Sequence, residues 1–400
     1  MEISVYLQET MNTRTMQRPF VYGMAVGGDN FTDRENERRR LKLDFRNGVN
    51  VLLLSPRRMG KTSLVRQAIS EMKADGDEDV IPIYMDIYDC RSEYDLLSRY
   101  ATAIFKATNN KAEQLIASVG QMLSRITPKI SYSLVPDQEI SIGINIKPTD
   151  YTPEEVLCLP DKIAKERGVR IVICIDEFQQ IGEMPDSMGV QKRLRGAWQH
   201  MENVSFCLFG SKKHMMERMF QSKRMPFYMF GEMMHLGPIP TDDWVSFILS
   251  RFAMSGKIIS PDIAEHICDT VGNYSTYVQQ LAWNVLAETK GEEVTKSDLA
   301  AGIEALLLQC DSLFTEQTAG LTTYQMNFLR ALCNDVDDNF TSREVAEEYN
   351  LGTKSNITRI KDALINRELI ETEVDPTTGK SRIHLCDKVF SLWLKKKLSL

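Results

Sequence analysis

The stretch that decides the fold is NVLLLSPRRMGKTSLVRQA, residues 50–68. A short apolar run, typical of a strand buried on both faces, leads into a basic turn and then into apolar residues at helical spacing. A strand, a tight turn and Gly-Lys-Thr at the start of a helix form the context of a phosphate-binding loop. The pattern G-x-x-x-x-G-K-[ST] is matched with one departure, because Ser55 stands where the first glycine is usual.

The loop predicts particular contacts with a nucleotide. Backbone N–H groups of residues 57–62 would surround the β-phosphate, assisted by the positive end of the helix. Lys61 would neutralise charge on the β- and γ-phosphates, and the Thr62 hydroxyl would ligate Mg²⁺. The loop residues predicted to bind the nucleotide are Ser55, Pro56, Arg57, Arg58, Met59, Gly60, Lys61, Thr62 and Ser63.

The serine at position 55 does not exclude this function. The first motif position lies where the strand ends, so a small residue serves there if its φ stays negative. Pro56 stiffens the turn and removes no phosphate-binding N–H if it lies outside the phosphate cradle. Arg57 and Arg58 either add positive charge at the mouth of the loop or are solvated or salt-bridged side chains.

A second motif is VRIVICIDEF, residues 169–178, whose apolar run ends in Asp176 and Glu177. Ligands of open α/β sheets bind at the carboxyl ends of the strands. Asp176 is therefore expected to hold Mg²⁺, directly or through water, and Glu177 to orient and deprotonate the attacking water. The alternative is an acid pair that only caps the next helix. Two motifs at strand ends favour nucleotide binding.

A third polar position, Ser211, ends the run VSFCLFGS. It would lie between the two motifs and contact the γ-phosphate or the attacking water, or it would cap the following helix; the two roles are compatible. The predicted catalytic residues are thus Glu177, Lys61 and Ser211, and the predicted metal ligands are Thr62 and Asp176.

No arginine finger stands out. Arg193, Arg195 and Arg224 are candidates, and each is also explained as a solvated or structural side chain. The segment VGNYSTYVQQ contains no arginine that could act as a sensor. We therefore expect hydrolysis to be slow or to depend on a partner.

Apolar runs at 48–55, 80–89, 169–178 and 204–211 predict four strands, which alternate with helical patterns. This alternation predicts an α/β fold with a mostly parallel sheet and helices on both faces. Alternating residues at about 129–147 predict a hairpin insert. The predicted domains are an N-terminal arm (1–21), a P-loop ATPase core (22–236), a helical lid (237–315) and a C-terminal winged helix (316–400).

The bulk composition is that of an ordinary globular protein, with 43% hydrophobic and 26% charged residues. The net charge of −7 argues against non-specific coating of nucleic acid. No signal peptide and no apolar run of about 18 residues are visible, so neither secretion nor a membrane partner is predicted. Eight cysteines without a C-x-x-C pair indicate reduced thiols in a cytoplasmic protein.

Several segments together resemble the archaeal-type ATPase family, a P-loop group near the AAA+ origin-recognition and STAND ATPases: FTDRENE, SPRRMGKTSLV, IDEFQQI, FGSKKHMMERMF and HLGPIP. The resemblance covers about residues 20–310, and the closing HLCDKVFSLWLKK is similar to the family's C-terminal ending. It implies ATP and Mg²⁺ as cofactors. It also implies that Phe31, Asp33, Arg34 and Glu35 form a box beside the base of the nucleotide. Phe230 departs from the family, because many relatives have an arginine there.

The function is left open among three hypotheses. The first is an ATP-hydrolysing switch with the winged helix as its output; the second is a DNA-binding module stabilised by ATP; the third is a degenerate loop that binds no nucleotide. In the winged helix, Lys354, Asn356, Arg359 and Lys361 are expected to face outward, with Lys380 and Arg382 in the wing. Roughly balanced charge from residue 321 onward leaves DNA and protein as alternative partners, and an oligomer is compatible with both.

Overall fold

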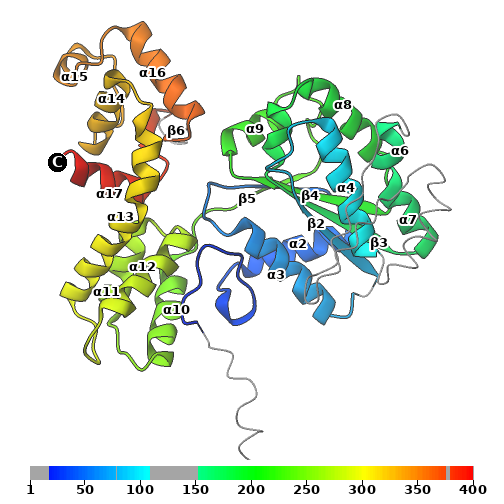
Figure 1. Ribbon diagram of the computed structural model, residues 1–400, viewed down its shortest axis with the longest axis horizontal. Helices are drawn as coiled ribbons and strands as arrows, with labels where there is room; N and C mark the ends of the chain where they lie inside the picture. Colours follow the sequence, from blue (N-terminus) through cyan, green and yellow to red (C-terminus); the bar gives the residue numbers. More distant parts are fainter. Residues whose placement is uncertain (1–17, 78, 109–151, 375–378, 400) are drawn as a thin grey trace, which may run out of the picture. The chain divides into compact units, whose positions relative to one another are not determined.

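The computed structural model describes residues 18–77, 79–108, 152–374 and 379–399. Residues 34–237 form one compact unit, and residues 1–33 with 238–400 form a second (Figure 1). The predicted hairpin at 129–147 and residues 1–17 of the predicted arm lie outside the described residues. Within the described part of the chain, no helix combines the length and hydrophobicity needed to cross a membrane.

The first unit is built on a five-stranded sheet in which all neighbouring strands are parallel. The strands are β1 (Val51–Leu54), β2 (Val80–Asp86), β3 (Arg170–Asp176), β4 (Val204–Gly210) and β5 (Glu232–His235). Their order is β2-β3-β4-β1-β5, so β4 lies between β1 and β3. The α/β fold with a parallel sheet is confirmed, and β1 and β4 are buried along their whole length, as strands covered on both faces are.

The sequence patterns predicted four strands, and β5 is a fifth. It is four residues long and lies at the edge of the sheet, where its one partner among the described strands is β1. Its residues alternate between half-buried and exposed, and the sequence EMMH carries no β-branched or aromatic side chain. Such a short edge strand is defined by its pairing with β1 rather than by its own residues.

Figure 1 shows α2 and α3 on one face of the sheet and α8 and α9 on the other. The helices of this unit are α2 (Glu35–Asn47), α3 (Lys61–Ala74), α4 (Glu93–Thr108), α6 (Pro153–Leu157), α7 (Leu159–Arg167), α8 (Ser187–Trp198) and α9 (Lys213–Gln221), with the 3-10 helix η2 (Phe178–Glu183). Aromatic rings from β4, η2, α8 and the segment after α9 stack in the core; Trp198 and Phe206, for example, have ring centroids 4.1 Å apart.

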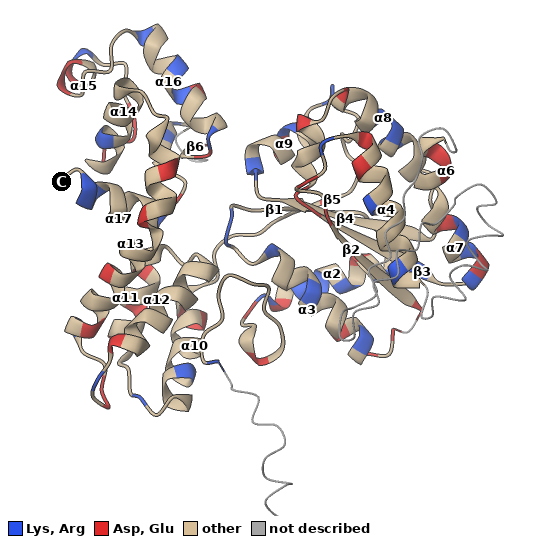
Figure 2. Ribbon diagram, in the orientation of Figure 1, with Lys and Arg blue, Asp and Glu red and all other residues tan. Residues whose placement is uncertain are grey.

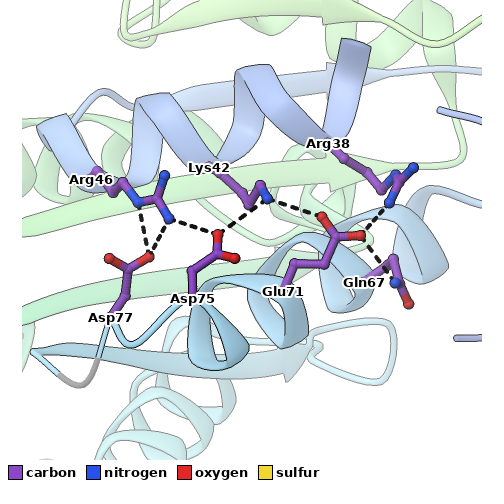
Figure 3. A network of polar contacts seen from close by, with 7 residues as sticks. All are labelled: Arg38, Lys42, Arg46, Gln67, Glu71, Asp75 and Asp77. Atoms are coloured by element: carbon purple, nitrogen blue, oxygen red, sulfur yellow. Dashed lines mark hydrogen bonds and ion pairs between the residues drawn. The ribbon is translucent and has the colours of Figure 1, made fainter. Parts of the chain in front are cut away.

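Helix α2 is fixed to α3 by a row of ion pairs (Figure 3). Arg38, Lys42 and Arg46 recur every four residues and so lie on one face of α2. Arg38 and Lys42 contact Glu71 on α3, and Lys42 and Arg46 contact Asp75 at its end. Arg46 also pairs with Asp77, at 2.7 Å. This row holds the far end of the helix that the phosphate-binding loop opens.

The described part of the second unit is mainly helical, with a hairpin, a short 3-10 helix and an isolated β-bridge between Ile258 and Glu293. Its helices are α10 (Thr241–Met254), α11 (Pro261–Val271), α12 (Ser275–Glu288), α13 (Lys296–Ala319), α14 (Thr323–Cys333), α15 (Arg343–Glu348), α16 (Lys354–Asn366) and α17 (Lys388–Lys397), preceded by η1 (Gly28–Asn30). Side-chain caps start many of them, including Thr322, Ser342 and Thr353 before the three helices α14, α15 and α16. The antiparallel strands β6 (Ile370–Val374) and β7 (Ser381–Leu385) follow, as predicted for a winged helix.

The predicted lid and the predicted winged helix share one hydrophobic core. Helix α13 is continuous from Lys296 to Ala319, across the predicted boundary between residues 315 and 316. Its Phe314 packs against Phe390 and Trp393 of α17, with ring centroids 5.3 and 5.7 Å apart. The domain limits stay predictions, but the packing makes α10–α17 one continuous body of side chains.

Candidate active site

The basic loop after β1 reaches the start of α3 through left-handed backbone conformations. Arg58 and Gly60 have positive φ values, of 66° and 85°, whereas the φ of Ser55 is not positive. The φ of Gly60 is a conformation that glycine adopts without strain. Gly60 is the N-cap residue of α3. Because glycine has no side chain, no capping side chain bonds the N–H groups of the first turn. Such a helix start attracts anions.

Lys61 lies inside this loop rather than pointing into solvent. Its side chain is buried, and Nζ donates to the carbonyls of Ser55 at 3.2 Å and Pro56 at 3.0 Å. It also lies 3.3 Å from Oγ of Ser55, which accepts a further bond from it. Serine in place of the usual glycine thus adds an acceptor for the lysine, and the loop closes around a positive charge.

Thr62 and Asp176 bring the two motifs together. The Thr62 hydroxyl donates to Oδ2 of Asp176 at 2.8 Å, from the first turn of α3 to the end of β3. Burial raises the pKa of Asp176, and the charges of Glu177 and Asp86 add to the rise, while the bond from Thr62 opposes it. An anionic carboxylate in this position therefore favours a cation beside it.

Glu177 follows directly in a left-handed backbone conformation with φ of 55°. Its Oε2 accepts a bond from the Ser211 hydroxyl at 2.8 Å and another from Nε2 of Gln179. The helix that follows Ser211 is capped by Lys212 without a side-chain bond. The structure therefore directs the Ser211 hydroxyl to Glu177 and shows no side-chain cap from it on α9.

These residues fit a nucleotide with Mg²⁺. Mg²⁺ is held in proteins by one or two carboxylates together with substrate phosphates and water, and Thr62 and Asp176 supply a hydroxyl and a carboxylate oxygen. Within the described ranges, no cluster of three or more histidine, cysteine or acidic side chains forms a complete metal site. The oxygen pair matches an ion whose remaining ligands come with a phosphate.

The residues of the predicted base-binding box have other contacts in the structure. Phe31 is half-buried after η1, and its N–H donates to the carbonyl of Gly28. Arg34 is buried, and its guanidinium donates to the carbonyl of Gly237 at 2.6 Å and to Glu37 at 3.1 Å. Arg34 and Gly237 are the two ends of the first unit, so this bond joins both places where the chain leaves it. Contact of Phe31 and Arg34 with the nucleotide stays a prediction.

The arginine-finger candidates on α8 are engaged within their own unit. Arg193 makes two bonds to Glu93, at 2.6 and 2.7 Å. Arg195 stacks over the ring of Phe230, with its guanidinium carbon 4.9 Å from the ring centre. These contacts support structural roles for both.

Two residues beside the site were missed in the sequence. Asp86 ends β2 and lies in register with Asp176, so two strand ends carry aspartates side by side. Asp86 could have been predicted from the sequence, because the apolar run IPIYMD ends in an aspartate just as IVICID does. Gln179 gave no local signal, since its contact with Glu177 depends on the turn of η2.

Known proteins share this architecture. A family described as "Probable winged helix domain" matches residues 312–396. A Walker-type ATPase of Pyrococcus abyssi has a TM-score of 0.69 at 16% identity, covering 94% of this chain and 100% of that one. The ORC2 protein of Aeropyrum pernix, in ADPNP-ADP complexes, has a TM-score of 0.56 at 13% identity, covering 96% of this chain and 99% of that one. A comparison with curated proteins finds no match. The chain thus has the fold of a P-loop Walker-type ATPase with a helical lid and a C-terminal winged helix, and the resemblance seen in the sequence is confirmed at the level of the fold.

Proposed function

We propose that the chain binds ATP with Mg²⁺ and hydrolyses it, acting as a switch whose output is the winged helix. The observation that carries the proposal is the 2.8 Å bond between Thr62 and Asp176, which joins the phosphate-binding loop to the acidic strand end. Lys61 and the start of α3 add positive charge on the loop side. ORC2 of Aeropyrum pernix, with the same fold, is solved with ADPNP and ADP.

Each residue then has a defined task. Lys61 and the loop N–H groups hold the phosphates, and Thr62 and Asp176 hold Mg²⁺. The metal, when bound, neutralises charge on the phosphate oxygens. Glu177 accepts the proton of the attacking water, and Ser211 keeps the Glu177 carboxylate in place through its 2.8 Å bond.

The proposed rate is slow or partner-dependent. Residues 271–280 of the lid contain no arginine, and Arg193 is already bonded to Glu93. An arginine beside the γ-phosphate normally stabilises the charge of the transition state. A partner that supplies such a charge would therefore raise turnover.

The lid and the winged helix respond together in this proposal. Tyr277 of α12 donates to Asp387, which caps α17, at 2.7 Å, and Tyr274 donates to the carbonyl of Cys386 at 2.6 Å. Trp393 of α17 donates to Asp311 of α13 at 2.8 Å. A movement of the lid helices is therefore transmitted to the winged helix without a flexible joint between them.

Glu177→Gln tests the hydrolysis directly. The variant should bind Mg-ATP as the wild type does, while turnover falls by about 100-fold or more, because a general base contributes about 10²–10⁴ to rate. Glu166→Gln, an exposed acid on α7, is the matched control. Undiminished hydrolysis in the Glu177 variant would remove the assignment of the base.

DNA binding is the second candidate function. Figure 2 shows basic residues on α16. Lys354 and Arg359 of this helix are exposed, and neither takes part in an ion pair within the described residues. Such side chains are free to contact phosphates. Replacing both with alanine should weaken duplex binding and lower its salt dependence by about one charge per residue. No mobility shift of any duplex, with or without ATP, would favour a protein partner.

A further inference from the structure

The carboxylate of Glu177 is held at one oxygen only. Ser211 and Gln179 both donate to Oε2, and Oε1 accepts no bond from the described residues. The two donors come from different elements, the end of β4 and the helix η2. Two bonds from different directions fix the rotation of a carboxylate and leave its other oxygen free for a water molecule.

Gln179 is a buried glutamine whose amide is only partly hydrogen-bonded. Its side chain is 2% exposed, and its Oε1 has no hydrogen-bond partner within the described part of the chain. A buried amide oxygen without a donor lowers stability. The amide is therefore retained at a cost, while its Nε2 is directed at Glu177. A residue selected for packing alone would be apolar here.

Gly210 provides the space that this amide needs. A Cβ at position 210 would lie 1.8 Å from Oε1 of Gln179 and 3.0 Å from its Cδ. Gly210 is the last residue of β4, and its φ is not in the left-handed region. Its backbone therefore does not require glycine. The amide of Gln179 requires glycine at position 210, because any side chain there would displace the amide.

We propose that Gln179 and Gly210 form a positioning pair for Glu177: Gly210 leaves room for the Gln179 amide, and the amide orients the Glu177 carboxylate toward the attacking water. This inference rests on the proposed hydrolysis, since it gives the oriented carboxylate its task. In this proposal Gln179 acts through its bond to Glu177, as a positioning residue. Only the turnover step should depend on it.

Gln179→Ala removes the donor. The full-length variant should keep its Kd for Mg-ATP and its KM within about twofold, while kcat falls about 10- to 100-fold, as for a residue that orients a reacting group. Gln179→Glu, which keeps the length but replaces the donor with a carboxylate, should not restore kcat. Gln199→Ala, on an exposed glutamine at the end of α8, is the control.

Gly210→Ala tests the same contact without removing any group of the site. In the wild-type background it should lower kcat to a similar degree, with Mg-ATP binding unchanged. In the Gln179→Ala background it should lower kcat no further, because no amide remains to be displaced. Non-additivity of this kind identifies residues that act through one contact.

Three results would overturn the inference. Wild-type kcat in Gln179→Ala, with Glu177-dependent turnover in the wild type, would remove the positioning role and leave the proposed function intact. An equal loss from Gly210→Ala in both backgrounds would show that the end of β4 is damaged directly. Absence of Glu177-dependent turnover in the wild type would overturn both the hydrolysis and the positioning pair.

Discussion

Thr62 and Asp176 lie 114 residues apart in the chain, and a hydrogen bond of 2.8 Å joins their side chains. The bond connects the start of α3 to the end of β3, although β4 lies between β1 and β3 in the sheet. The Thr62 hydroxyl and the partly buried Asp176 carboxylate thus lie together beside the N-terminus of α3, and a helix N-terminus favours anions. The proposed binding of Mg²⁺ and a phosphate group rests on this arrangement.

Thr62→Ala should weaken Mg-ATP binding at least about tenfold, which corresponds to about 1.4 kcal/mol. ATP binding in the presence of EDTA should change little, because the hydroxyl acts through the metal. Thr62→Ser keeps the hydroxyl and serves as the matched control. Calorimetric titration with and without Mg²⁺ measures both values, and an equal loss of affinity without Mg²⁺ would contradict the assigned ligand.

The row of ion pairs between α2 and α3 predicts a pH dependence of stability. Burial opposes ionisation of Glu71, but bonds from Arg38, Gln67 and Lys42 outweigh it, and the pKa of Glu71 is lowered from 4.5. A lowered folded-state pKa gives stability that is fully present above about 4.5 and is lost as pH falls through the lowered value. The Glu71 contribution should be about 0.2–1 kcal/mol, reduced by salt.

Glu71→Gln makes this contribution measurable by urea unfolding at pH 7 and at a series of lower pH values. The free energy of unfolding of the wild type should fall more steeply below pH 4.5 than that of the variant. Glu154→Gln, on an exposed acid of α6, should follow the wild type. Parallel curves for wild type and Glu71→Gln would mean that the ionised Glu71 carboxylate contributes nothing to stability.

Tyr277→Phe tests the connection between lid and winged helix. The hydroxyl donates to a carboxylate at 2.7 Å from a side chain that is 1% exposed, so its loss should lower the free energy of unfolding by about 1.5–3 kcal/mol. Asp387 still caps α17 through Val389 and Phe390, which limits the change to one contact. Tyr324→Phe, half-exposed on α14, is the control. Equal unfolding energies for the two variants would contradict the role of this bond.

Much of the fold was predictable because local sequence patterns indicate its elements. The apolar run before Ser55, the glycine before Lys61 and the acids after Ile175 define two strand ends and one helix start without reference to the rest of the chain. The three helices and hairpin of the winged helix follow from caps and spacing in the same way. Each of these elements can therefore be predicted from its own residues.

The remainder depends on contacts between distant residues. Strand β5 is defined by pairing with β1, and the Ser211 hydroxyl turns to Glu177 because β4 ends beside β3. Gln179 and Gly210 are informative only as a pair, since neither shows its partner in the sequence. The shared core of lid and winged helix likewise appears only when α13 is seen to pack against α17.

We propose that the loop around Lys61 binds Mg-ATP, and thermal unfolding with and without Mg-ATP tests this binding. The proteins compared are the wild type, Lys61→Ala and Lys73→Ala, which changes an exposed lysine on the same helix. At a nucleotide concentration about 100 times Kd, binding stabilises the folded state by about 2.7 kcal/mol. Mg-ATP should raise the Tm of the wild type and of Lys73→Ala and leave the Tm of Lys61→Ala unchanged. An equal rise in all three, or no rise in the wild type, would contradict the proposed binding.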